Sequence, residues 1–161
     1  MTKLYTCEGD KGYTDLANGK RVSKDSVLIE LIGTLDEFSS VLGLAKVFSK
    51  NEELSVDIEA IQNMTFSVMA ELAGGKQSLT DEIIKNVESM TDKYCEEFSG
   101  FTLSGKTEAS AFLDVARCVV RRAERIAVKA FRKKRISPYA MCWLNRISDL
   151  AYAMGRFAAK E

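Results

Sequence analysis

Histidine is absent from this 161-residue sequence, and its absence excludes a large part of enzyme chemistry. The chain has no His general acid or base, and it has no Ser-His or Cys-His nucleophile pair. Zinc and iron sites with His ligands are excluded too, as is the Glu-x-x-His signature of di-iron helical bundles. Any metal ion held here is therefore expected to be a hard cation bound through oxygen, such as Mg²⁺ with a nucleotide.

Signals for metal clusters, nucleic acids and membranes are also missing. The four cysteines, Cys7, Cys95, Cys118 and Cys142, form no Cys-x-x-Cys pair, which favours reduced structural thiols over a zinc site or a disulfide framework. The 23 Lys and Arg residues balance the 23 Asp and Glu residues, so the charge indicates no nucleic-acid or membrane-surface partner. No apolar run is long enough to span a bilayer, and the N-terminus lacks the apolar core of a signal peptide. We therefore expect a cytoplasmic protein.

Proline occurs once, and apolar residues recur at helical spacing through most of the chain. This pattern predicts an all-α bundle of about five helices in a single domain, residues 1–161, preceded by a Gly-rich arm at residues 1–24. The first helix is expected to be capped by Ser23 or Asp25 and to end near residue 48. The others are expected at about 53–73, 80–98, 109 to the basic run 132–135, and 138–159.

Residues 109–125 contain neither Gly nor Pro, and their apolar residues recur at helical spacing. One side of this predicted helix is apolar: Phe112, Ala116, Val119, Val120, Ala123, Ile126, Ala127 and Ala130. The opposite side is a polar stripe: Asp114, Arg117, Arg121, Glu124 and Arg125. Acids and bases at this spacing can neutralise one another on a solvated face. Alternatively, because every basic position of the stripe is Arg, it suits bidentate binding of phosphate or carboxylate on a partner.

Three other segments offer groups for chemistry. In the arm, Gly9 and Gly12 flank Lys11 between the hydroxyls of Thr6 and Thr14, which suits either a phosphate cradle or an ordinary turn. In the first helix, Gly33 permits close approach of a ligand or another helix. Asp36 three residues later is either solvated or paired with an Arg of this chain or of a neighbouring subunit. In the last helix, Asn145 and Asp149 share a face, which surface polarity alone would explain.

The segment 100–107, Gly-Phe-Thr-Leu-Ser-Gly-Lys-Thr, matches the Walker A pattern letter for letter. That motif binds phosphate only where it follows a buried strand and opens a helix in an α/β sheet. The residues before it read as the end of a helix, and no alternation of strands and helices surrounds it. We therefore interpret the match as accidental.

Taken in order, the polar segments resemble the PduO-type ATP:cob(I)alamin adenosyltransferases over almost the whole chain. The segments that carry the resemblance are Tyr-Thr-x-x-Gly-Asp-Lys-Gly-x-Thr at 5–14, Arg-Val-Ser-Lys-Asp at 21–25, Gly-Thr-Leu-Asp-Glu at 33–37, Phe-Thr-Leu at 101–103, Ala-Arg-Cys-Val-Val-Arg-Arg-Ala-Glu-Arg at 116–125 and Leu-Asn-Arg-Ile-Ser-Asp at 144–149. Arg-x-x-x-Arg-Arg-Ala-Glu-Arg is the most specific of them.

The resemblance implies a five-helix bundle that assembles as a homotrimer, with an active site at each subunit interface. It implies that ATP with Mg²⁺ adenosylates cob(I)alamin, that a reductase supplies the reduced cobalt, and that a cobalamin-dependent enzyme accepts the product. Arg117 would pair with Asp36 across the interface, and Phe101 would lie beside the corrin. Glu124 would contact the Mg²⁺ as well as the nucleotide. The implied nucleotide site comprises Thr6, Gly9, Asp10, Lys11, Gly12, Thr14, Lys24, Arg121, Glu124 and Asn145.

This chemistry suits a sequence without His, because the nucleophile is the cobalt itself and the protein supplies positioning and charge. The sequence also departs from the family pattern. Cys7-Glu8 stands where the arm usually has Lys-Thr, Leu28 where a basic residue is common, Ile32 where Tyr is common, and Ser104-Gly105-Lys106 where Pro-Gly-Gly is usual. Glu8 and Leu28 are the support for an alternative, a non-catalytic ATP- or corrinoid-binding carrier or sensor. A purely structural bundle does not explain why the polar positions match.

Overall fold

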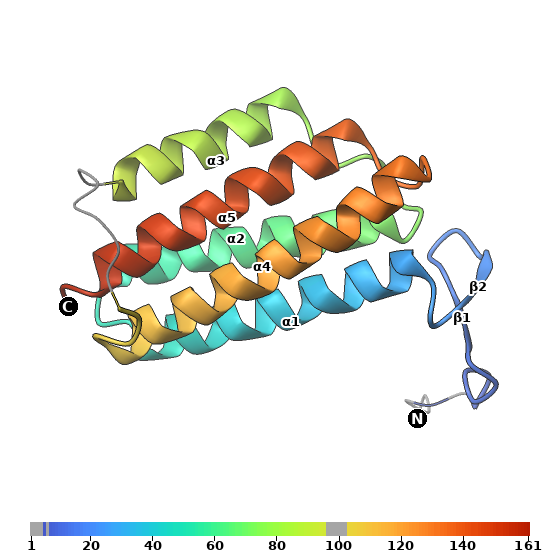
Figure 1. The fold of residues 1–161 in the computed structure, drawn as a ribbon, viewed down its shortest axis with the longest axis horizontal. Coiled ribbons are helices and arrows are strands. Elements are labelled where there is room, and N and C mark those ends of the chain that lie inside the picture. The colour runs from blue at the N-terminus through green and yellow to red at the C-terminus, as the bar shows by residue number, and fades with distance from the viewer. Residues whose placement is uncertain (1–4, 6, 96–102) are drawn as a thin grey trace.

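The computed structural model describes residues 5, 7–95 and 103–161. Within them, five long helices lie lengthwise in one bundle (Figure 1). Helix α1 packs against α2 and α4, and α5 packs against α4 and α3. The bounds of the helices are α1 Val27–Phe48, α2 Glu52–Leu72, α3 Asp81–Tyr94, α4 Glu108–Arg132 and α5 Pro138–Ala158. The predicted all-α five-helix fold is confirmed.

The core is made by the apolar faces of these helices. Trp143 of α5 and Phe38 of α1 are its largest fully buried side chains. On α4 the apolar side read from the sequence faces inward as predicted, and only Phe112 is partly exposed. Because burying apolar side chains is the main favourable term in folding, this continuous core accounts for the bundle without any bound group.

The polar residues between the helices act as caps. Asn51, Thr80, Thr107 and Ser137 each accept a hydrogen bond from a backbone N–H of the first turn of the helix that follows. Thr107 also donates its hydroxyl to the carbonyl of Ala158 at 2.8 Å. This hydroxyl, the last residue of the Walker-like segment, is therefore occupied in capping α4. The described residues also contain no parallel strand before α4, which a P-loop requires.

Two helix ends differ from those predicted. The N-cap position of α1 is Ser26 rather than Ser23 or Asp25, and the Ser26 side chain makes no capping hydrogen bond. The Ser23 hydroxyl is donated to Asp25 instead. Helix α3 ends at Tyr94, short of the predicted residue 98, because Cys95 adopts an extended backbone conformation with ψ 120°. Residues 96–98 lie outside the described residues.

Asp114 was predicted to lie on the polar stripe of α4, opposite the apolar side, but it is buried. Its side chain is only 8% exposed and accepts two hydrogen bonds from Nη2 of Arg156, at 2.6 and 2.7 Å. The reason is the packing of α5 against α4: Gly155 lies so near that a Cβ there would be in ordinary van der Waals contact with Cβ of Leu113, at 3.5 Å. The sequence pattern could not show that α5 covers this part of the stripe.

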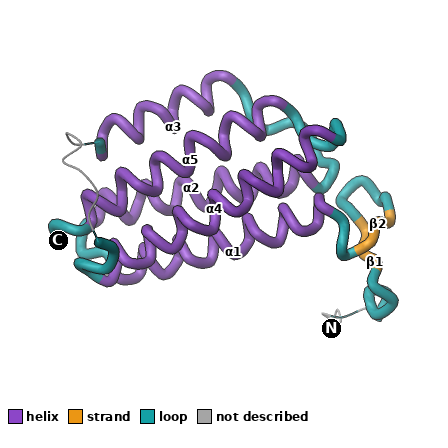
Figure 2. The backbone as a smooth tube through the Cα atoms, in the orientation of Figure 1, coloured by secondary structure: helices purple, strands orange, loops and turns teal. Residues whose placement is uncertain are grey.

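The arm folds into a small hairpin beyond the N-terminal end of α1 (Figures 1 and 2). Strand β1, Tyr13–Asp15, pairs antiparallel with β2, Arg21–Ser23. The turn between them touches the bundle, because the side chain of Asn18 fills the space beside Gly74, whose φ is +93°. This contact anchors the hairpin at the loop after α2.

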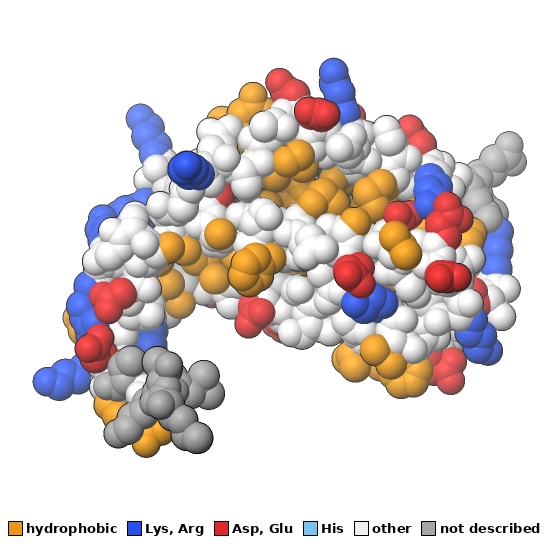
Figure 3. Space-filling view, turned by 180° about the vertical axis from the view of Figure 1, so that it is seen from behind, with side chains coloured by type: hydrophobic (Ala, Val, Ile, Leu, Met, Phe, Trp, Pro, Cys, Tyr) orange, Lys and Arg blue, Asp and Glu red, His pale blue; other side chains and the backbone are white. Residues whose placement is uncertain are grey.

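The surface carries dispersed charge. Figure 3, the face opposite to that of Figure 1, shows acidic and basic side chains interspersed over the surface, some of them side by side, with apolar groups between them. None of the helices in the described residues is long and apolar enough to cross a membrane.

Candidate functional site

The first candidate site is the loop of the arm that precedes β1. The N–H of Gly12 donates to the carbonyl of Gly9 at 3.2 Å, and the carbonyl of Gly12 accepts from the N–H of Lys24 at 2.9 Å. Gly12 has φ +81°, a conformation that favours glycine. Asp10 and Lys11 therefore lie at the tip of a closed turn that is hydrogen-bonded to the residue after β2.

The absence of a side chain at Gly9 leaves room for the ammonium group of Lys24 beside this loop. A Cβ atom at this position would lie 2.9 Å from Nζ of Lys24, closer than side chains normally pack. The ammonium group of Lys24 therefore lies directly against the backbone of the turn. A loop backbone with an adjacent ammonium group is a common arrangement for binding phosphate.

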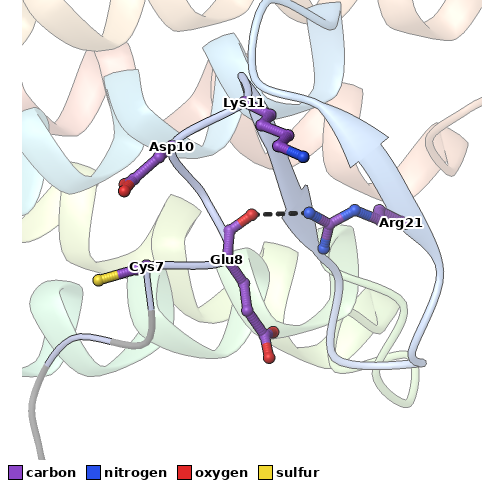
Figure 4. A pocket seen from close by; sticks show the side chains of 5 residues that line it. All are labelled: Cys7, Glu8, Asp10, Lys11 and Arg21. Atoms are coloured by element: carbon purple, nitrogen blue, oxygen red, sulfur yellow. Dashed lines mark hydrogen bonds between the residues drawn. The ribbon is translucent and has the colours of Figure 1, made fainter.

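Arg21 holds the loop against β2 through a hydrogen bond and also forms an ion pair. Its Nη2 donates to the carbonyl of Glu8 at 2.7 Å (Figure 4). Its Nη1 pairs with Asp15 at 3.0 Å. Lys11 and Arg21 extend toward the same side of the loop, whereas the carboxylate of Asp10 points the other way (Figure 4). These residues line an open hollow of about 590 Å³ together with Cys7 and Glu8. The sequence had placed Arg21 in a family segment without giving it a role.

The second candidate site lies on α4 and α5. Nδ2 of Asn145 donates to Oε1 of Glu124 at 3.2 Å, so two residues predicted to share a pocket are brought together. Arg121, one turn before Glu124, is exposed, and within the described chain its guanidinium has no hydrogen bond or ion pair. An exposed cation beside a hydrogen-bonded carboxylate and amide can bind a nucleotide.

The structure does not join these two sites within one chain. No hydrogen bond or ion pair of the described residues links Lys11 or Lys24 to α4 or α5. Figure 1 shows why: the arm extends past the end of α1, away from the middle of α4. Within the described residues of one chain, the two candidate sites therefore lie apart.

Asp36 of α1 and Arg117 of α4 also do not meet within the chain. Asp36 is exposed and has no hydrogen bond or ion pair among the described residues. Nε of Arg117 is buried without an acceptor, and its Nη2 reaches only Sγ of Cys118 at 3.8 Å. The ion pair that does link α1 to α4 is Arg122 with Glu37. Gly33 has open space around it, so within this chain no helix makes use of its missing side chain.

The remaining predicted residues are placed as follows. Thr14 is half-buried in β1, and Asp149 is exposed on α5. Thr6 and Phe101 lie outside the described residues.

The described part of the chain holds no cluster of three metal-ligating side chains. Mg²⁺ bound with a nucleotide needs only one or two protein carboxylates, because phosphates and waters complete its shell, so Glu124 alone fits such an ion.

Residues 4–158 match the family model described as cobalamin adenosyltransferase. This chain belongs to the cobalamin adenosyltransferase family. A corrinoid adenosyltransferase of Citrobacter freundii is 36% identical to it, over 97% of this chain and 94% of the relative. One of Bacillus subtilis is 35% identical, over 96% of this chain and 85% of the relative.

Solved structures of the family have the same fold. One is a variant of the PduO-type ATP:corrinoid adenosyltransferase of Lactobacillus reuteri complexed with cobalamin and ATP. It matches with a TM-score of 0.89 and 29% identity, over 98% of this chain and 94% of that one. Another variant of the same enzyme, complexed with ATP, matches with a TM-score of 0.89 and 30% identity, over the same shares of both chains.

Proposed function

We propose that this protein transfers the 5′-deoxyadenosyl group of ATP to the cobalt(I) of a corrinoid, giving adenosylcobalamin and triphosphate. The observation that carries the proposal is the likeness to a corrinoid adenosyltransferase at 36% identity over 97% of the chain. The Lactobacillus reuteri enzyme with the same fold is complexed with cobalamin and ATP. The substrates we propose are therefore ATP with Mg²⁺ and cob(I)alamin or a related corrinoid.

The arm binds the triphosphate in this proposal. Lys11 and Lys24 supply the positive charge, and Gly9 and Gly12 let backbone N–H groups approach the phosphates. The resemblance also implies Asp10, Thr6 and Thr14 for this part of the site, although Asp10 points to the opposite side of the loop from Lys11 and Thr6 lies outside the described residues. The Arg21 contacts support this role, because they hold the loop in shape before any ligand arrives.

Arg121, Glu124 and Asn145 bind the other side of the nucleotide. Arg121 has no competing ion pair in the described chain, so its guanidinium is available to phosphate oxygens. Glu124 has one oxygen held by Asn145, and its other oxygen is available to the Mg²⁺ that accompanies ATP.

The reaction breaks the bond between the 5′-carbon of ATP and its oxygen and forms a cobalt–carbon bond with an electron pair from cobalt(I). The triphosphate leaves with the electrons of the broken bond, so the charge that develops lies on its oxygens. Fixed cations near those oxygens stabilise the transition state more than the ground state. No protein nucleophile is required, in keeping with a chain that contains no His.

The site is completed between copies of the chain, in a homotrimer. Asp36 of one copy pairs with Arg117 of the next, which gives each group the partner that it lacks within one chain. Exposed apolar side chains on the same two helices support an interface there: Leu44, Val47 and Phe48 on α1 and Val115 on α4. The family resemblance would give Phe101, which lies outside the described residues, a role beside the corrin.

The proposal also includes partners and a location. A reductase supplies cobalt(I), and a cobalamin-dependent enzyme receives the product, because both the reduced substrate and the adenosylated product are reactive at cobalt. We propose a cytoplasmic location, which the free thiols of Cys7, Cys118 and Cys142 support.

Substituting Arg121 tests the site. Arg121→Ala is expected to lower adenosyl transfer at least about 100-fold, the effect of removing one preorganised charge donor. Its unfolding free energy should stay within about 0.5 kcal/mol of the wild type, because the residue is exposed. Arg132→Ala, at the exposed end of the same helix, is the matched control and should keep full activity. Normal turnover by Arg121→Ala would overturn the site.

A further inference from the structure

Arg146 of α5 lies at the centre of a chain of polar contacts that crosses three helices. Its Nε donates to Oε1 of Glu88 on α3 at 2.8 Å, and its Nη1 donates to Oδ1 of Asn145 at 2.9 Å. Nδ2 of Asn145 then donates to Oε1 of Glu124 on α4 at 3.2 Å. The contacts therefore run from α3 through Arg146 and Asn145 to the carboxylate of the candidate nucleotide site.

The two neighbours of Asn145 determine the orientation of its amide. A guanidinium group can only donate hydrogen bonds, and an ionised carboxylate can only accept them. The amide satisfies both neighbours in one orientation alone, with Oδ1 toward Arg146 and Nδ2 toward Glu124. The opposite orientation would place a donor against a donor and an acceptor against an acceptor.

Arg146 is itself held in place. Its ion pair with Glu88 joins α5 to α3, and the hydrogen bond to Glu88 raises the pKa of Arg146. Asn145 is exposed and has no other side-chain hydrogen bond among the described residues. Without Arg146, its amide would therefore keep only the hydrogen bond to Glu124 and would be held less firmly.

We propose that Arg146 is a positioning residue: it fixes the amide of Asn145 and, through it, the carboxylate of Glu124 in the nucleotide site. The expected effect of Arg146 on catalysis rests on the proposed function, whereas its effect on the orientation of Asn145 does not. The fixed amide holds Oε1 of Glu124, so that Oε2 is the oxygen presented to the nucleotide and its Mg²⁺. Arg146 contacts neither substrate and acts only through its neighbour.

A double-mutant cycle tests whether Arg146 acts through Asn145. Arg146→Met is expected to lower kcat/KM for ATP by about tenfold or more, as for the loss of a charge-assisted hydrogen bond. In the Asn145→Ala background, Arg146→Met should lower kcat/KM for ATP by less than about twofold, because the amide that Arg146 positions is absent. Equal losses in both backgrounds would overturn the proposal. Lys46→Met is the matched control: it breaks a partly exposed ion pair, with Glu59 across α1 and α2, and should leave kcat/KM unchanged.

A second readout does not depend on turnover. The side-chain amide ¹H–¹⁵N signals of Asn145 are identified by their loss in Asn145→Ala. They are expected to shift in Arg146→Met and to stay in place in Lys46→Met. Unchanged amide signals in a folded Arg146→Met protein would overturn the proposal. If wild-type protein transfers no adenosyl group, the proposed function fails, while the amide signals still decide whether Arg146 orients Asn145.

Discussion

Nζ of Lys24 lies 2.9 Å from the place that a Cβ atom on Gly9 would occupy. The two residues stand at opposite ends of the arm, and the hairpin between them brings the ammonium group against the glycine backbone. The missing side chain of Gly9 is therefore what allows a positive charge to approach the loop so closely. We infer that this pair, rather than the loop sequence alone, makes the arm suited to phosphate.

Gly9→Ala is expected to raise the KM for ATP by about three- to tenfold, because the new methyl group displaces the ammonium of Lys24 from the loop. Lys24 is flexible and can move aside, so the free energy of unfolding should hardly change. Steady-state kinetics measure the KM for ATP, and urea unfolding measures the free energy of unfolding. In a Lys24→Met background, Gly9→Ala should have no further effect. An additional loss there would show that Gly9 acts independently of Lys24.

Charge reversal at Asp36 or Arg117 is expected to weaken self-association. Asp36→Lys or Arg117→Glu alone places like charges against each other across the proposed interface, and sedimentation velocity should show dissociation of the trimer. The combined variant restores opposite charges and should recover the trimer. Trimers that persist in both single variants would contradict the pairing, as would a monomeric wild-type protein.

Arg156→Met is expected to destabilise the fold by about 3 kcal/mol, because it leaves the buried carboxylate of Asp114 without its partner. Urea unfolding measures the loss. The double variant Asp114→Asn, Arg156→Gln should lose less, since no buried charge is left. A change of less than about 0.5 kcal/mol in Arg156→Met would mean that the ion pair is not important for stability.

The protein is expected to lose stability at alkaline pH through Tyr94 and Lys93. Burial, and then its 2.6 Å hydrogen bond to Asp57, raise the pKa of Tyr94 above the ordinary value of 10.0. The hydrogen bond to the same carboxylate raises the pKa of Lys93 above 10.5. Both groups keep their protons longer in the folded state, so their contribution is complete below these values and is lost as the pH rises beyond them.

Thermal unfolding between about pH 10 and pH 12 checks this expectation. The melting temperature of the wild type should fall steeply as the pH rises. That of Asp57→Asn should start lower and fall less, because the variant lacks the carboxylate that both groups contact. Parallel curves for the two proteins would contradict the assignment to this cluster.

The helices could be predicted from the sequence because their apolar positions repeat over many turns. The strands of the arm could not, since each has only three residues in a polar, Gly-rich segment. The burial of Asp114 depends on Arg156, which is distant in sequence and comes from another helix. Local periodicity contains no information on such a partner.

The candidate site was predictable in part. The segments quoted for the family resemblance contain Glu124 and Asn145, and the structure brings these two together. Arg21 and Arg146 lie in the same segments, but their roles depend on hydrogen bonds to residues 13 and 58 positions away, Glu8 and Glu88. The only sequence signal for Arg21 and Arg146 was that they lie beside residues with assigned roles in those segments.

The central claim, adenosyl transfer to cobalt(I), is tested most directly by spectroscopy of the wild-type protein. Purified protein is mixed anaerobically with ATP, Mg²⁺ and chemically reduced cobalamin, and the absorbance of cobalt(I) is followed. We predict its conversion to the spectrum of adenosylcobalamin, with one triphosphate released for each cobalamin. Binding of ATP or corrinoid without this conversion would contradict catalysis and favour a carrier or sensor. Absence of binding by either ligand would contradict the site itself.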